Sequence, residues 1–133
     1  MPFAIDHIVL NVRDVAATLR FYADVIGLEP ERVEEFEAGS VPFPSLRVNA
    51  DTLVDLLPPA IWGGGEPGER RTNVDHFCLV MHAAEWPALE ARLKEAGVDY
   101  ELGPITLWGA HGNGTSVYIR DTEGNRVELR YYG

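Results

Sequence analysis

Apolar and polar residues alternate in short runs along the chain, and the most informative run occurs twice. Residues 5–12 (Ile-Asp-His-Ile-Val-Leu-Asn-Val) have the composition of a strand, and residues 73–80 (Asn-Val-Asp-His-Phe-Cys-Leu-Val) repeat the pattern. The two histidines, His7 and His76, are 69 residues apart in a chain of 133 residues. Similarity at a distance of about half the chain predicts two copies of one structural unit.

A helix is predicted after each of these strands. Apolar residues recur at helical spacing over residues 14–27, where Asp14 is a candidate N-cap and Gly27 a candidate stop. The second helix is predicted to begin near Pro87, which suits the first turn of a helix, and to end at Gly97. Both halves of the chain therefore begin with a strand followed by a helix.

Further strand-like runs complete each half. They lie at 30–37, 45–48 and 52–57 in the first half, and at 98–102, 114–120 and 126–132 in the second. Glycine-containing hairpin turns are predicted at 111–114 and 122–125. The predicted fold class is α+β, with two βαβββ modules at 1–60 and 73–133 that form a curved mixed sheet. Gly and Pro residues make 61–72 a linker by composition.

Composition narrows the classes of partner. The net charge of −10 disfavours nucleic acid and anionic membranes, because both attract basic surfaces. No apolar run approaches the roughly 20 residues that span a bilayer. The single cysteine, Cys78, excludes an internal disulfide framework, and the first residues carry no signal-like run. We therefore expect a cytoplasmic protein.

The candidate chemistry consists of two histidines and one carboxylate. Glu128 interrupts an apolar strand between Val127 and Leu129, and His7 and His76 occupy equivalent positions in the repeated strand. If the sheet curves around a cavity, these three side chains can converge from separate strands. Two imidazoles and one carboxylate with open positions form a set that suits Fe(II) and related divalent ions.

Asp55 is the matching acidic residue of the first half. It lies inside the apolar run 53–57 and follows His7 at nearly the distance at which Glu128 follows His76. A buried carboxylate is costly without a partner, and a metal at a pseudo-twofold axis would compensate both acids. Because Asp is shorter than Glu, three interpretations of Asp55 stay open: a fourth metal ligand, a residue that supports the ligands without touching the metal, or a residue unrelated to the site.

Other residues have alternative interpretations. His111 is either a turn residue or an acid–base group of a pocket, Cys78 is expected to fill the core, and His82 is expected to be exposed at the end of its strand. Three aromatic residues in predicted loops could line a pocket or pack in the core or a dimer interface: Phe43, Trp62 and Trp108.

Taken together, several segments resemble the vicinal oxygen chelate superfamily. Its members include glyoxalase I, fosfomycin-resistance thiol transferases, methylmalonyl-CoA epimerase, extradiol dioxygenases and bleomycin-resistance proteins. The similar segments are 6–14, 18–22 and 25–28, which resemble its first module, and 114–129, which resembles its closing hairpin.

The resemblance implies a fold, a cofactor and a ligand set. It implies paired βαβββ modules that form a U-shaped sheet around one divalent metal (Fe, Mn, Zn or Ni), in a homodimer that often exchanges modules. The implied ligands are His7, His76 and Glu128, with Asp55 where glyoxalase I has a fourth ligand. The implied chemistry is chelation of a small-molecule substrate through vicinal oxygens, with the metal as a Lewis acid.

Differences within the family narrow the prediction. Asn11 replaces an arginine typical of glyoxalase I, Asp55 replaces its glutamate, and Val9 replaces a threonine typical of the fosfomycin enzymes. Ser116 and Tyr118 do match the hairpin of the fosfomycin enzymes. Bleomycin-binding members typically lack the ligands that this chain retains.

The sequence therefore predicts a metalloenzyme of the glyoxalase/dioxygenase type: a lyase, isomerase, transferase or dioxygenase. Tyr118 and His111 are the candidates for substrate contact or proton transfer. The alternative is a metal-free, ligand-sequestering protein of the bleomycin-resistance type.

Overall fold

The chain divides into two compact units, Met1–Glu69 and Arg70–Gly133, which are described separately. The structure is a computed structural model. Asp6, Asn73 and Asp75 of the sequence repeat lie outside the residues that the structure describes, and so does most of the predicted linker. The described residues are 5, 7–64, 74 and 76–133.

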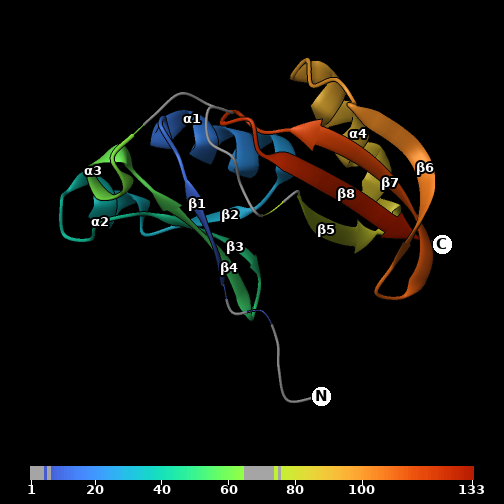
Figure 1. Cartoon of the computed structure of the whole chain (residues 1–133), viewed down its shortest axis with the longest axis horizontal. Coiled ribbons are helices and arrows are strands. Elements are labelled where there is room, and N and C mark those ends of the chain that lie inside the picture. The colour runs from blue at the N-terminus through green and yellow to red at the C-terminus, as the bar shows by residue number, and fades with distance from the viewer. Residues whose placement is uncertain (1–4, 6, 65–73, 75) are drawn as a thin grey trace. The chain divides into compact units, whose positions relative to one another are not determined.

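The first unit contains one mixed sheet with the strand order β1-β4-β3-β2 (Figure 1). Strand β1 is parallel to β4, and the other neighbours are antiparallel. Its elements are β1 (His7–Asn11), α1 (Val15–Arg20), η1 (Phe21–Ile26), β2 (Glu29–Glu31), α2 (Val33–Glu37), β3 (Ser45–Asn49), β4 (Thr52–Leu57) and α3 (Pro59–Trp62).

The second unit repeats this arrangement with the strand order β5-β8-β7-β6. Strand β5 is parallel to β8, and α4 lies along one face of the sheet (Figure 1). The prediction of two βαβββ modules is thus confirmed. The elements are β5 (Phe77–His82), η2 (Ala83–Glu85), α4 (Trp86–Glu95), β6 (Leu102–Gly109), β7 (Gly112–Arg120) and β8 (Arg126–Tyr132).

The first predicted helix begins and ends where the sequence indicates. The Asp14 side chain accepts a hydrogen bond from the Ala17 N–H at 2.9 Å, as an N-cap should. Gly27 ends the helix with a left-handed φ of 101°. Between them, α1 continues directly into the π-helical turns of η1.

The predicted strand at 30–37 is wrong beyond residue 31. Arg32 adopts a left-handed φ of 60°, and the chain then forms the short helix α2. Val33 and Phe36 are three residues apart, which is helical spacing, and the glutamates between and after them tolerate a helix better than a strand.

In the second unit, the strand that follows α4 lies later than predicted. The predicted strand at 98–102 meets β6 only at Leu102, and β7 begins at Gly112, inside the predicted turn. Ile105 and Leu107 are half-buried while their neighbours are exposed, which is strand alternation. Trp108 therefore belongs to β6 and not to a loop.

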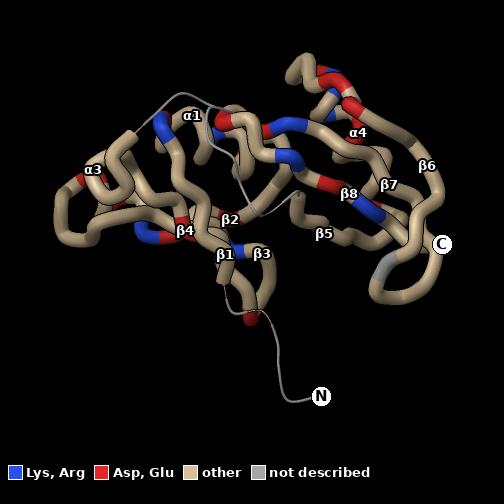
Figure 2. Tube along the Cα trace, in the orientation of Figure 1, with Lys and Arg blue, Asp and Glu red and all other residues tan. Residues whose placement is uncertain are grey.

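The two faces of the second sheet differ in chemistry. The Trp86 ring of α4 lies 5.2 Å from the Tyr131 ring, so this strand face is turned toward the helix. Val127 and Leu129 share that face and are fully buried. The opposite face of β8 carries alternating basic and acidic residues, as Figure 2 shows along this strand.

Candidate functional site

Glu128 is the centre of a hydrogen-bond network on the sheet face opposite α4. Its side chain comes from β8 and only 4% of the residue is exposed. The Oε2 atom accepts hydrogen bonds from Ser116 Oγ at 2.7 Å and from Arg130 Nη2 at 2.9 Å. Both partners are themselves buried, so this half of the carboxylate is shielded from water.

The other carboxylate oxygen of Glu128 faces a histidine and a tyrosine. The Tyr118 hydroxyl donates to Oε1 at 2.9 Å, and His76 Nε2 lies 3.1 Å from the same oxygen. The His76 and Tyr118 rings meet edge to face at 5.1 Å, which fixes the imidazole beside the carboxylate. The structure therefore brings three of the predicted site residues together.

The network sets the charge state of these groups. Burial alone would raise the pKa of Glu128, but hydrogen bonds from Ser116, Tyr118 and Arg130 together lower it below its usual value. Burial, together with the hydrogen bond to Glu128, raises the pKa of Tyr118. At neutral pH the site thus presents an ionised carboxylate and a protonated phenol.

His76 and Glu128 have the right spacing to share a divalent ion. Two donors that each lie about 2.1 Å from one ion, at right angles to each other, are about 3 Å apart. The 3.1 Å between Nε2 and Oε1 agrees with this, and it also suits a hydrogen bond between the two groups. Within either unit, the described residues contain no group of three or more His, Cys, Asp or Glu side chains that could hold a metal ion. A complete metal site needs a further ligand.

The first unit presents His7 and Asp55 on equivalent positions. Val9 pairs with Asp55 in the sheet, just as Cys78 pairs with Glu128, so in both units the acid lies opposite the residue two places after the histidine. Side chains two apart in a strand share a face. Asp55 is half-buried and accepts a hydrogen bond from the hydroxyl of Ser45 at 2.6 Å.

Cys78 lies directly beside Glu128 in the sheet and is exposed, so the prediction that it fills the core is wrong. The sulfur itself is partly desolvated, and this burial, together with the nearby Glu128 charge, raises the pKa of Cys78 to about 12. The thiol is therefore protonated at neutral pH and is a poor metal ligand. His82 is exposed at the end of β5, as predicted.

His111 lies in the turn between β6 and β7, where its ring meets the Tyr132 ring edge to face at 5.5 Å. Its backbone N–H donates to the Tyr132 hydroxyl at 3.2 Å, and Arg130 Nη1 donates to the same oxygen at 3.2 Å. These contacts link His111 to Glu128 indirectly, through Tyr132 and Arg130.

Residues 4–129 match the family described as the Glyoxalase/Bleomycin resistance protein/Dioxygenase superfamily. The chain belongs to this superfamily. The match covers both units and confirms the resemblance seen in segments 6–14, 18–22 and 25–28 and in the closing hairpin at 114–129.

The chain is also similar to individual proteins. The chain is 28% identical to Virulence protein STM3117 of Salmonella typhimurium over 129 residues, which are 96% of this chain and 83% of that protein. The crystal structure of STM3117 aligns with a TM-score of 0.75 at 25% identity and covers 100% of this chain and 99% of that one.

Two solved structures of the superfamily carry a named activity or ligand. Lactoylglutathione lyase from Agrobacterium tumefaciens aligns with a TM-score of 0.62 at 25% identity, covering 98% of this chain and 94% of that one. A mutant of the fosfomycin resistance protein FosX from Listeria monocytogenes, complexed with Mn(II) and 1S,2S-dihydroxypropylphosphonic acid, aligns with a TM-score of 0.66 at 19% identity. The FosX alignment covers 100% of this chain and 93% of that one, and it supports the fold alone.

Two of the residues that hydrogen-bond Glu128 were not predicted as site residues from the sequence alone. Ser116 and Arg130 are cross-strand partners in β7 and β8, and Arg130 lies two residues after Glu128 on the same strand face. That spacing is visible in the sequence and could have placed Arg130 beside the carboxylate. Its burial could not be predicted, because the Ser116 hydroxyl and the Trp108 carbonyl that it contacts come from β7 and β6.

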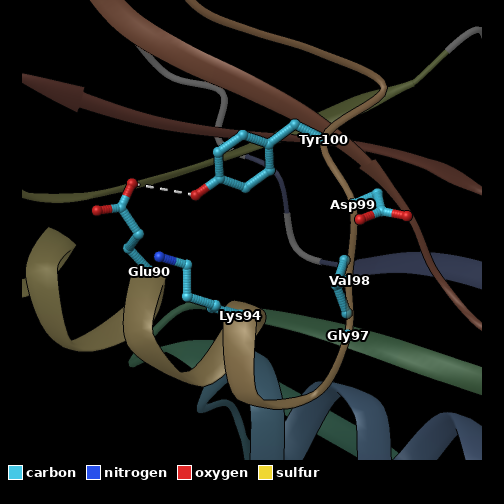
Figure 3. A pocket seen from close by; sticks show the side chains of 6 residues that line it. All are labelled: Glu90, Lys94, Gly97, Val98, Asp99 and Tyr100. Atoms are coloured by element: carbon cyan, nitrogen blue, oxygen red, sulfur yellow. Dashed lines mark hydrogen bonds between the residues drawn. The ribbon is translucent and has the colours of Figure 1, made fainter.

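A separate hollow of about 400 Å³ lies at the C-terminal end of α4 (Figure 3). The Tyr100 hydroxyl donates to Glu90 at 3.2 Å across it, and burial together with Glu90 raises the pKa of Tyr100 to about 12. None of the candidate residues of the glyoxalase-type site lines it. Its lining consists of Glu90, Lys94, Gly97, Val98, Asp99 and Tyr100.

None of the helices in the described part of the chain is long and apolar enough to cross a membrane.

Proposed function

We propose that this member of the glyoxalase superfamily is a metalloenzyme that binds one divalent ion through His7, His76 and Glu128. Its substrate would be a small molecule whose vicinal oxygens chelate the ion. The observation that carries the proposal is the distance of 3.1 Å between His76 Nε2 and Glu128 Oε1. The other carboxylate oxygen, Oε2, accepts a hydrogen bond from Ser116. Hydrogen bonds from such a network orient a metal ligand and tune the properties of the bound metal.

His7 is the proposed third ligand because it occupies the position in the first unit that His76 occupies in the second. The equal register of β1 on β4 and of β5 on β8 supports this equivalence. Asp55 is the proposed fourth ligand or a group behind the ligands. Its hydrogen bond from Ser45 resembles the hydroxyl bond that Glu128 receives from Tyr118.

A divalent ion (Fe, Mn, Zn or Ni) would supply Lewis-acid stabilisation of negative charge on a chelated oxygen. The Tyr118 hydroxyl is protonated and lies beside Glu128 Oε1, so it can donate a hydrogen bond or a proton to a substrate oxygen. His111, exposed in the β6–β7 turn, is the second candidate for proton transfer. The proposal covers lyase, isomerase, transferase and dioxygenase chemistry.

Two further features belong to the proposal. We place the enzyme in the cytoplasm, in agreement with its single cysteine. We also propose that it works as a homodimer, as the resemblance to the vicinal oxygen chelate superfamily implies. Light scattering on the purified protein tests the dimer, and a monomer at micromolar concentration contradicts it.

The ligand set is tested by Mn(II) titration of single variants. His7→Ala, His76→Ala and Glu128→Ala should each lower Mn(II) affinity by at least about 100-fold, because each removes a protein ligand and even the loss of a residue that supports a ligand costs about 10–100-fold. His82→Ala is the matched control, since it removes an exposed histidine from β5, the strand that directly follows His76. Asp55→Ala separates the two roles: a loss as large as that of His7→Ala makes Asp55 a ligand.

The proposal is wrong if His7→Ala and Glu128→Ala bind Mn(II) as wild type does. If both variants also bind a small-molecule ligand as wild type does, the metal-free ligand-sequestering protein is supported instead. Thermal melting of each variant in a chelator shows whether a loss of affinity comes from loss of folding.

A further inference from the structure

One oxygen of the Glu128 carboxylate is fully engaged by protein donors. Ser116 Oγ lies 2.7 Å from Oε2, and Arg130 approaches the same oxygen with Nη2 at 2.9 Å and Nε at 3.2 Å. Arg130 Nε also donates to Ser116 Oγ at 3.0 Å, so the three groups form a closed cluster. A carboxylate oxygen has two lone pairs, and the donors at Oε2 use both.

Arg130 is itself held in place by groups from two strands. Only 4% of the residue is exposed, and its Nη2 donates to the backbone carbonyl of Trp108 in β6 at 3.0 Å. Its Nη1 donates to the Tyr132 hydroxyl in β8 at 3.2 Å. The donors of a guanidinium lie in one rigid plane, so anchoring both ends fixes the direction in which the group faces Glu128.

The first unit lacks this arrangement at the equivalent place. Leu57 pairs with Asn11 there, just as Arg130 pairs with Val80, so an apolar side chain replaces the guanidinium two residues after Asp55. The clamp on a carboxylate oxygen is therefore a property of the second unit and of Glu128.

We infer that Arg130 is a positioning residue that restricts Glu128 to binding a metal through Oε1 alone. The inference rests on the proposed function. A carboxylate can bind a metal through one oxygen or through both, and the second oxygen would occupy a further coordination position. With Oε2 kept by Arg130 and Ser116, that position stays open for a substrate that chelates through two oxygens.

Arg130→Met tests this inference, because methionine fills similar space without donors or charge. In this variant Oε2 is released and the carboxylate can turn both oxygens toward a metal. The expected result is a split. Mn(II) affinity changes little, because the released second carboxylate oxygen becomes available to the ion, while oxalate binds the Mn(II)-loaded protein about tenfold more weakly or worse. Oxalate serves as a probe with two chelating oxygens, and the electron paramagnetic resonance of Mn(II) reports both events.

Two further variants control the experiment. Arg120→Met removes an exposed arginine that pairs with Glu101 in the same unit, and it should change neither affinity. Ser116→Ala removes one donor from Oε2 and keeps the charge of Arg130, so it should weaken oxalate binding in the same direction but less. If Arg130→Met does not fold in the presence of a chelator, the oxalate affinity of Ser116→Ala tests the inference instead.

A parallel loss of Mn(II) and oxalate affinity would overturn the inference, because it would show that Arg130 merely supports the site. Unchanged oxalate binding in Arg130→Met would overturn it as well. These outcomes leave the proposed function intact. Wild-type protein that binds no Mn(II) would overturn the proposed function and the inference together.

Discussion

Glu128→Gln is expected to destabilise the metal-free protein by about 3–5 kcal/mol, the usual cost of breaking a buried ion pair on one side. The substitution keeps the shape of the side chain but removes the negative charge from a pair in which the side chains of Glu128 and Arg130 are 5% and 4% exposed. Arg130 would then remain buried as an uncompensated cation. Each hydrogen bond to a charged group is worth about 1.5–3 kcal/mol, so the loss of two or three of them reaches the same range.

The matched control is Glu101→Gln. Glu101 forms a comparable pair with Arg120, but the two side chains are 39% and 51% exposed. An exposed pair contributes about 0–1 kcal/mol, so this variant should lie close to wild type. The contrast between the two glutamates isolates the effect of burial from the effect of charge.

The assay is urea unfolding in the presence of a chelator at one fixed protein concentration, for Glu128→Gln, Arg130→Met and the double variant. The double variant should be more stable than the sum of the single losses predicts, because neither charge is then left alone. A cost below about 1 kcal/mol for Glu128→Gln, or strictly additive losses, would refute the buried network.

Two further substitutions test how the fold supports the site. Leu93→Ala should cost about 2–5 kcal/mol in urea unfolding because Leu93 of α4 is fully buried, whereas Leu102→Ala, at a residue that is 44% exposed, should cost much less; equal losses would contradict the packing of α4 on its sheet. Gly103→Ala should be strongly destabilising, since Gly103 has a φ of 97° and an added Cβ would overlap the Ser116 carbonyl oxygen; Gly112→Ala, with a φ of 88° and open space around it, should show only the backbone strain of about 1–2 kcal/mol. Similar melting temperatures for the two glycine variants would contradict the close approach of β6 and β7.

Much of the fold could be predicted because its signals are local. The repeated strand, the N-cap Asp14 and the left-handed Gly27 are each specified by a few neighbouring residues. The errors arose where local signals compete. A run of glutamates between Val33 and Phe36 suits a helix as well as an exposed strand, and Gly103 with its neighbouring proline hides the alternation of β6.

The site was predictable to the extent that strand alternation places residues on a face. That rule puts His76 and Glu128 on the same side of neighbouring strands, and the structure brings them to 3.1 Å. The role of Arg130 could not be predicted in this way. Its burial depends on the Trp108 carbonyl, a partner in β6 that the sequence pattern alone placed in a loop.

The most direct test of the central claim is the metal content of wild-type protein purified without chelators or a metal-affinity tag, followed by reconstitution with Fe(II), Mn(II) and Zn(II). The proposed function predicts about one tightly bound divalent ion per chain, held by two histidines and one carboxylate. Protein that retains no ion, before and after reconstitution, would contradict the metal site and leave the ligand-sequestering protein as the better account.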